Sequence, residues 1–165
     1  MVERGAFMAL DKGKRAKEVF QMICFSLENR NWKYNKKESE LMVSFSVVGK
    51  DLPMHLKIYV EADREIVTCY TSQDFTVPKE KVPAFCMGIC AINNHLIDGS
   101  FDFDILRRVV TYRLTASYHD AVLGSELIQY IFDCSTATVD DVNVEMKAFA
   151  EGKLDYDKFI QKMLS

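Results

Sequence analysis

Hydrophobic residues near the start of the chain recur at the spacing of an amphipathic helix. Between Arg15 and Asn29, apolar side chains come every three or four residues, which places them on one helical face. Asparagine favours turns and helix ends, so Asn29–Asn31 should end this helix. Residues 1–13 lack a clear period, and we expect residues 1–14 to form an N-terminal arm. The stripe consists of Val19, Phe20, Ile23, Cys24 and Leu27.

Strict alternation of apolar and more polar residues then replaces the helical period. Leu41–Val47 shows it first, and Met54–Glu61 repeats it after a turn at Gly49–Asp51. A third run, Ile66–Thr71, is rich in β-branched residues. Both connections are too short for a crossover helix, so the sequence predicts a three-stranded antiparallel meander.

The second half of the chain adds a helix, two strands and C-terminal helices. The helix predicted over Lys79–Leu96 ends in an asparagine-rich turn. Ser100–Ile105 then alternates between the two faces as a strand does, and Arg108–Ala116 should pair with it. Helical spacing returns over residues 125–152, where weak helix formers at 135–138 allow a break into two helices, and a short helix closes the chain.

Together these elements predict a single α+β domain over residues 15–165. The expected fold is a twisted antiparallel sheet of about five strands with the helices packed on one face. The element order is helix, three-strand meander, helix, two strands and C-terminal helices. A chain of 165 residues buries roughly 70% of the surface that its unfolded form exposes, so it needs no disulfide or metal to fold.

Charge and cysteine content narrow the class of protein. The net charge is −3, with both signs interspersed, which argues against a nucleic-acid patch. Single-stranded binding through exposed aromatics stays open. The N-terminal apolar patch stops at Asp11 and Lys12, too short for a signal peptide or a membrane span. The odd number of cysteines, five, does not suit a disulfide framework. We therefore expect a cytoplasmic protein with reduced thiols and neither nucleic acid nor membrane as a partner.

Two groups of side chains resemble fragments of metal sites. Cys86 and Cys90 share a helix face, but zinc would need His95 or another cysteine, and the apolar neighbours favour buried structural thiols. The aspartates of Asp98–Asp104 resemble part of a calcium loop, but they alternate with phenylalanine as in a strand. We expect no metal and no cofactor.

The sequence contains no recognisable catalytic motif. Its three histidines lie in different segments, and the nucleophile-elbow, phosphate-loop and dinucleotide-binding patterns are absent. We therefore predict no catalytic residues and a protein that is not an enzyme. A site assembled between helix and sheet from distant segments stays open.

The uncovered face of the predicted sheet is the candidate binding surface. It is polar, but it also carries Met42 and Tyr59, whose side chains suit protein contacts, and charges of both signs that include Arg113. We predict these three residues as partner-binding residues. A solvated face without a partner is the alternative, and the face or an unpaired edge strand would also suit dimerisation or strand addition. The face comprises Met42, Ser44, Ser46, His55, Lys57, Tyr59, Asp102, Asp104, Thr111 and Arg113.

The segment Ala91–Asp104 resembles the YbjN family of bacterial proteins. In that family a helix ends in an asparagine-rich turn, followed by a Gly-x-Phe strand, here Gly99–Phe101, and a strand with Tyr-Arg, here Tyr112–Arg113. The resemblance covers about residues 15–150. It implies a fold like that of the type III secretion chaperones, often dimeric, and no catalytic residues; the family label mentions regulation of sensory transduction. This chain departs from the pattern at Ile105–Arg108, where a glycine-containing turn is expected.

We therefore interpret the sequence as a non-catalytic, protein-binding or chaperone-like module with a regulatory role open. Its partner is a protein whose identity the sequence does not give. A homodimer is also expected, from the resemblance and from Phe7, Met8 and Leu10 in the arm. A small-ligand binder or enzyme, and a structural component of a larger assembly, remain as alternatives.

Overall fold

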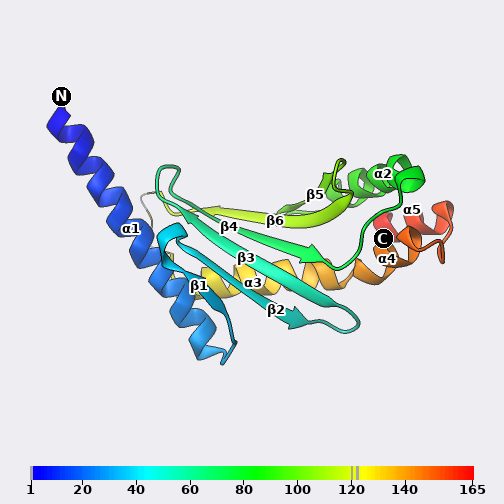
Figure 1. Ribbon diagram of the computed structural model, residues 1–165, viewed down its shortest axis with the longest axis horizontal. Helices are drawn as coiled ribbons and strands as arrows, with labels where there is room; N and C mark the ends of the chain where they lie inside the picture. The colour runs from blue at the N-terminus through cyan, green and yellow to red at the C-terminus, as the bar shows by residue number, and fades with distance from the viewer. Residues whose placement is uncertain (1, 120, 122) are drawn as a thin grey trace. The chain divides into compact units, whose positions relative to one another are not determined.

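The computed structural model describes residues 2–119, 121 and 123–165, with side chains from Asp11 onward. The helices and strands of this part follow the predicted order (Figure 1). The α-helices are α1 (Val2–Asn29), α2 (Val82–Asn93), α3 (Ser125–Asp140), α4 (Asn143–Ala150) and α5 (Tyr156–Leu164). The strands are β1 (Asn35–Lys37), β2 (Met42–Val48), β3 (Pro53–Glu61), β4 (Ile66–Gln73), β5 (Ser100–Asp104) and β6 (Val109–Ser117), and two 3-10 turns are η1 (Glu38–Glu40) and η2 (Lys79–Lys81).

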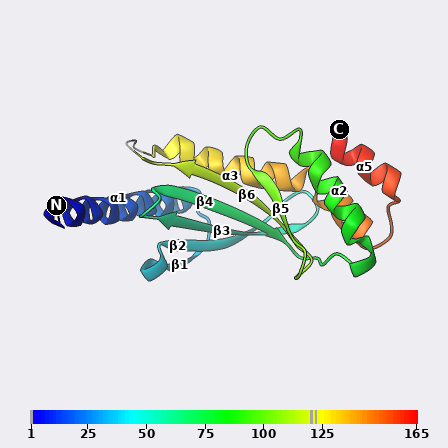
Figure 2. The same cartoon turned by 90° about the horizontal axis from the view of Figure 1, so that it is seen from above.

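The strands form one antiparallel sheet in the order β1-β2-β3-β4-β6-β5. β1 pairs with β2 so that Lys36 lies opposite Val43, and β5 pairs with β6 so that Phe101 lies opposite Tyr112. Figure 2 shows α3 following one face of the sheet. The predicted fold class, an antiparallel sheet with helices on one face, is confirmed.

The structure differs from the prediction in two ways near the N-terminus. The sheet has a sixth strand, β1, because three exposed polar residues (Asn35–Lys37) are too few to show alternation. The first helix begins at Val2 rather than Arg15, since the preceding segment holds no proline to stop a helix even though it lacks an apolar stripe. The division into an arm over 1–14 and one domain over 15–165 remains a prediction.

The C-terminal helices also break at a different place. The chain turns at Asp141 and Val142, between α3 and α4, and not within Ser135–Thr138. Ser135 and Val139 are fully buried, so packing of this helix face outweighs the weak helix propensity of the serine and threonines.

Residue contacts divide the chain into two compact units. The first contains residues 1–45, 57–69 and 115–132, and the second contains residues 46–56, 70–114 and 133–165. Each unit has its own buried apolar residues.

The first unit is held together by the predicted stripe of α1. Ile23 and Leu27 of this helix are at most 1% exposed. Beyond its end, the Trp32 ring tilts against Phe45 with centroids 5.3 Å apart and stacks on Phe132 at 6.1 Å. These contacts join α1, β2 and the start of α3 around one core.

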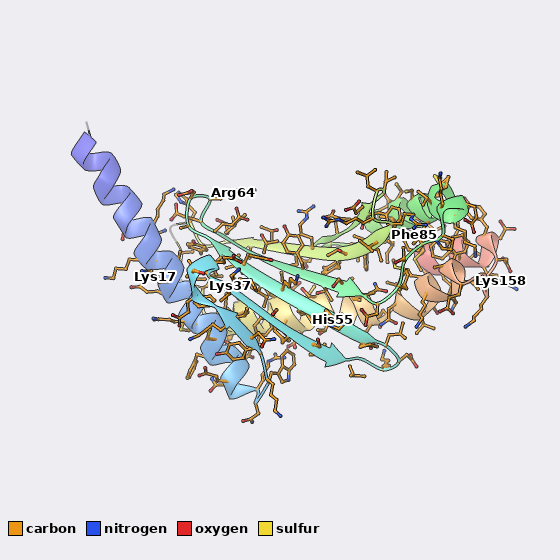
Figure 3. The ribbon with its side chains drawn as sticks, in the orientation of Figure 1. Lys17, Lys37, His55, Arg64, Phe85 and Lys158 are labelled. Atoms are coloured by element: carbon orange, nitrogen blue, oxygen red, sulfur yellow. The ribbon has the colours of Figure 1, made fainter. Side chains whose placement is uncertain are left out.

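Phenylalanine rings fill the centre of the second unit. Phe85 on α2, labelled in Figure 3, lies 5.2 Å from Phe103 and 5.7 Å from Phe159 between ring centroids. Phe159 stacks almost parallel on Phe149 at 4.2 Å. Gly88 permits this packing, because a Cβ atom there would lie 2.2 Å from the Phe159 ring. The cluster fastens α2, α4 and α5 to one another.

Candidate protein-binding site

The uncovered face of the sheet carries the polar side chains that alternation predicts. In the second unit, Ser46 Oγ lies 2.7 Å from Nδ1 of His55, and Nε2 of the same ring lies 3.0 Å from Oδ2 of Asp74. Figure 3 labels His55 on this face. These hydrogen bonds hold the Ser46, His55 and Asp74 side chains in place without a binding partner.

Two of the three predicted partner-binding residues lie side by side in the first unit. The Val60 N–H donates to the Leu41 carbonyl at 3.1 Å, and this register sets Met42 beside Tyr59 on the adjacent strand. Both side chains are half-buried; Tyr59 lies between the buried Ile58 and Val60, and Met42 precedes the buried Val43. Met42 offers an adaptable side chain and Tyr59 an amphipathic one, so these neighbouring strands present two side chains suited to protein contacts.

Arg113, the third predicted residue, lies in the second unit and is bound to Asp102. Its Nε lies 2.6 Å from Oδ2 and its Nη2 3.1 Å from Oδ1 of that carboxylate. Hydrogen bonding to Asp102 raises the pKa of Arg113. A partner would have to compete with this ion pair, which weakens Arg113 as a contact. The binding role of all three residues stays a prediction.

The sheet edge at β5 is closed by a side chain. Oδ1 of Asn93 accepts from the Phe101 N–H at 2.8 Å, and Nδ2 donates to the Phe101 carbonyl at 2.9 Å. These are the bonds that a neighbouring strand would make. Strand addition at β5 is therefore disfavoured, and the asparagine at the end of α2 has a structural role.

A groove of about 430 Å³ lies in the first unit between α1 and the β1–η1 segment. Phe20 and Cys24 are buried beneath it, whereas the Phe25 side chain is 54% exposed. Figure 3 labels Lys17 on α1 and Lys37 at the end of β1. The lining comprises Lys17, Phe20, Gln21, Cys24, Phe25, Glu28, Lys36, Glu38 and Leu41. The groove thus combines apolar surface with a rim of both charges.

Cys24 and Tyr34, near this groove, stay protonated at neutral pH. Burial raises the pKa of the Cys24 thiol. Burial and a 2.8 Å hydrogen bond to Glu28 raise the pKa of the Tyr34 hydroxyl, which donates to that carboxylate. A neutral thiol is a weak nucleophile, so Cys24 is poorly suited to nucleophilic attack.

A second hollow of about 370 Å³ lies elsewhere in the first unit. It combines apolar residues of α1 with the segment that follows β6, and Arg15 and Glu18 supply charge. The lining comprises Arg15, Glu18, Val19, Met22, Tyr118, Ala121 and Leu123. Its size and mixed lining would suit a small amphipathic molecule.

Glu65, in the turn between β3 and β4, is a buried carboxylate that no sequence pattern singles out. Its side chain is 2% exposed and lies 2.6 Å from Arg15, 3.0 Å from Lys12 and 2.8 Å from His119. Its carbonyl also accepts from the Tyr118 N–H at 2.9 Å. Hydrogen bonds from His119 and then Lys12 lower the pKa of Glu65. This cluster ties α1 and the end of β6 to the β3–β4 turn.

Replacing Glu65 with glutamine should destabilise the protein near neutral pH but not in acid. A carboxyl whose pKa is lowered by folding stabilises the fold above its ordinary value, 4.5 here, and loses that contribution as the pH falls through the folded value. Urea unfolding between about pH 6 and about pH 3 measures the gap between wild type and variant. Glu18→Gln, at an exposed position, is the control. A gap that did not narrow with acid would contradict the charge argument.

The residues that resembled metal ligands have other surroundings in the structure. Cys86 is half-buried and Cys90 is exposed on α2, so the expectation of buried structural thiols is wrong for Cys90. Asp102 binds Arg113, and Asp104 caps the turn that follows β5. Across the described residues, no three His, Cys, Asp or Glu side chains gather closely enough to hold a metal ion. Among the described helices, none has the length and apolar character that a membrane crossing requires.

Comparison with known proteins gives a fold likeness at low sequence identity. No family model matches the sequence, and no curated protein matches it. The crystal structure of YbjN from Escherichia coli, a candidate transcription regulator, matches with a TM-score of 0.58 and 12% identity, over 81% of this chain and 92% of that chain. The chain has the fold of YbjN.

A chain in the crystal structure of the ExsC–ExsE complex matches to a similar degree. Its TM-score is 0.57 and its identity 14%, over 76% of this chain and 90% of that chain. The likeness to YbjN expected from the asparagine turn and the Gly-x-Phe strand is therefore confirmed at the level of the fold. The second match is a protein seen in complex with another protein.

Proposed function

We propose that this chain is a non-catalytic, chaperone-like module that holds a segment of a partner protein in the groove between α1 and β1–η1. The groove itself carries the proposal, because it offers apolar surface with the Phe25 ring 54% exposed at its side. Exposed aromatic side chains beside apolar pockets are frequent anchors of protein interfaces. The fold likeness to a chain of the ExsC–ExsE complex supports a role in protein binding.

The charges around the groove favour a partner segment with polar residues on both sides of an apolar anchor. Lys36 and Glu38 lie 2.6 Å apart at the rim, so neither sign dominates. Rim charges of this kind steer and orient a partner more than they add affinity. The affinity would come mainly from an aliphatic or aromatic side chain that covers Phe25.

Phe25→Glu should remove partner binding and leave the fold intact. Glutamate is a good helix former, and the position is exposed, so stability should change by no more than about 0.5 kcal/mol. Immobilised wild type and variant are compared for the proteins that they retain from a native lysate, with quantitative mass spectrometry as the readout. Partners held by the groove should fall by at least about tenfold, the result of losing about 1.4 kcal/mol of contact.

Leu127→Glu is the matched control, because Leu127 is also an exposed apolar residue on a helix of the first unit and does not line the groove. Its set of partners should equal that of the wild type. A second variant, Met42→Ser with Tyr59→Ser, addresses the open face and avoids breaking the Arg113–Asp102 pair. Loss of partners in this variant but not in Phe25→Glu would move the binding site to the sheet face.

We also propose that the protein forms a homodimer, lies in the cytoplasm and has a regulatory role. The open face around Met42 and Tyr59 is the proposed surface for a second copy, since it is not used by the groove. A partner that is a nucleic acid or a membrane is not proposed.

A small-ligand binder remains the second candidate function because of the hollow beside Arg15 and Tyr118. A ligand at a hundredfold its dissociation constant would stabilise the fold by about 2.7 kcal/mol. Reproducible thermal stabilisation by one class of metabolite, lost in Met22→Trp, which would fill the hollow, would favour this function over protein binding.

A further inference from the structure

The turn between β5 and β6 is fixed by several hydrogen bonds. Oδ1 of Asp104 accepts from the N–H groups of Leu106 and Arg107, each at 2.9 Å, and the Asp104 carbonyl accepts from the Arg108 N–H at 2.6 Å. The Arg108 carbonyl in turn accepts from the Val77 N–H at 2.9 Å. The side chains at this tip therefore project from a rigid base.

The residues at the tip are poor choices for a turn that serves only the fold. Ile105 is 63% exposed and Leu106 93% exposed. Arg108 has a φ of +60°, a conformation that glycine or asparagine adopts at lower cost. Turns usually carry glycine, asparagine, aspartate or serine, so neither the two aliphatic residues nor this arginine is explained by turn chemistry.

The charge of the tip is positive. Arg107 is 83% exposed, with its Nε 3.8 Å from the Asp104 carboxylate, which is already engaged by two backbone N–H groups. Within the described part of the chain, Arg108 forms no ion pair. Two arginines, the exposed Arg107 and the half-buried Arg108, therefore follow two exposed aliphatic side chains.

We propose that this tip, Ile105–Arg108, is a second protein-binding element that takes an acidic segment of a partner with aliphatic side chains of its own. Its carboxylates would meet Arg107 and Arg108, which bind such groups in fork-like pairs. Its aliphatic residues would cover Ile105 and Leu106. The proposal goes beyond the groove and does not depend on it, since the tip belongs to the second unit.

A protein segment fits this tip better than a lipid surface does. Membrane-surface elements usually carry tryptophan or tyrosine at the headgroup level, or a long amphipathic face, and the tip has neither. Arginine, in contrast, is enriched at the centres of protein interfaces. The rigid base also reduces the ordering that binding would require.

The test uses the full chain and a short amphipathic peptide of leucine and glutamate, followed by the methyl resonances of Ile105 and Leu106. Saturable shifts at these methyls are expected, with affinity that falls as salt is added. A peptide with lysine for every glutamate should bind at least about tenfold more weakly. Vesicles with phosphatidylserine form the third arm.

Arg107→Ser with Arg108→Gly should weaken peptide binding by at least about tenfold and leave the melting temperature unchanged or higher, because glycine suits the left-handed conformation. Leu106→Asn should also weaken peptide binding by at least about tenfold without lowering the melting temperature. Phe25→Glu should bind the peptide like the wild type. The proposal is overturned if the acidic peptide does not bind, if the lysine peptide binds equally, or if Leu106 is needed for vesicles but not for the peptide. Loss of peptide binding in Phe25→Glu would also overturn it. If Phe25→Glu instead retains all lysate partners, the groove proposal fails and the proposal for the tip still stands.

Discussion

Replacing Phe159 with alanine should lower the free energy of unfolding by about 3–5 kcal/mol, the usual cost of deleting a buried phenylalanine ring. Phe159 is fully buried. Its ring stacks on Phe149 at 4.2 Å and contacts Phe85 at 5.7 Å, so the truncation opens a cavity among α2, α4 and α5. Urea unfolding measures the loss. Tyr156→Ala, on the same helix at an exposed position, should change stability by no more than about 0.5 kcal/mol.

The same experiment tests whether residues 15–165 unfold as one domain. Trp32, the only tryptophan, belongs to the first unit, whereas Phe159 belongs to the second. If the chain is one cooperative domain, as the sequence predicts, tryptophan fluorescence and far-ultraviolet circular dichroism should report the same lowered midpoint. A fluorescence midpoint equal to that of the wild type, with an earlier transition by circular dichroism, would show two separately unfolding parts.

Replacing Gly99 with alanine should cost about 2–5 kcal/mol, from two sources that act together. Gly99 has a φ of +69°, where a side chain is strained, and its Cβ would lie 2.4 Å from the Tyr112 hydroxyl and 2.8 Å from the Arg113 carbonyl. Tyr112 cannot easily move away, because it is fully buried and donates to the Asp98 carbonyl at 2.6 Å. Urea or thermal unfolding gives the measured cost.

Gly152→Ala separates the two sources. Gly152 also has a positive φ, +78°, but a Cβ there meets only the flexible end of Lys81, at 3.3 Å. Its substitution should therefore show the backbone cost alone, about 1–2 kcal/mol. Equal losses in the two variants would mean that the Tyr112 ring and the Arg113 carbonyl make room for the methyl group.

The sequence predicted the parts of the fold that depend on local pattern. Alternation in Ser100–Asp104 placed Phe101 and Phe103 toward the helices and left Asp102 exposed, as the structure has them. The helical stripe of α1 gave Phe20 and Cys24, which lie beneath the groove. The stripe did not include Phe25, because a single exposed aromatic residue outside the stripe does not alter the helical period.

Contacts between distant segments were beyond sequence reasoning. Glu65 sits in a short polar turn that looks solvated, and its cationic partners Lys12, Arg15 and His119 come from segments more than 45 residues away. An acidic residue beside an arginine in a tight turn is too common a pattern to reveal burial. The resemblance to the YbjN family drew attention to the asparagine turn. The hydrogen bonds between the Asn93 side chain and the Phe101 backbone could be recognised only in the structure.

The pairing of Asn93 with Phe101 bears on how copies of this protein can associate. A sheet grows into a fibre only when both of its edges accept a new strand, because each added copy must leave a free edge behind it. At β5 that place is taken by an asparagine amide, and at the opposite edge β1 offers three residues, two of them lysine. Edge-to-edge growth of this chain is therefore disfavoured at β5, and with it a fibre, which would need both edges.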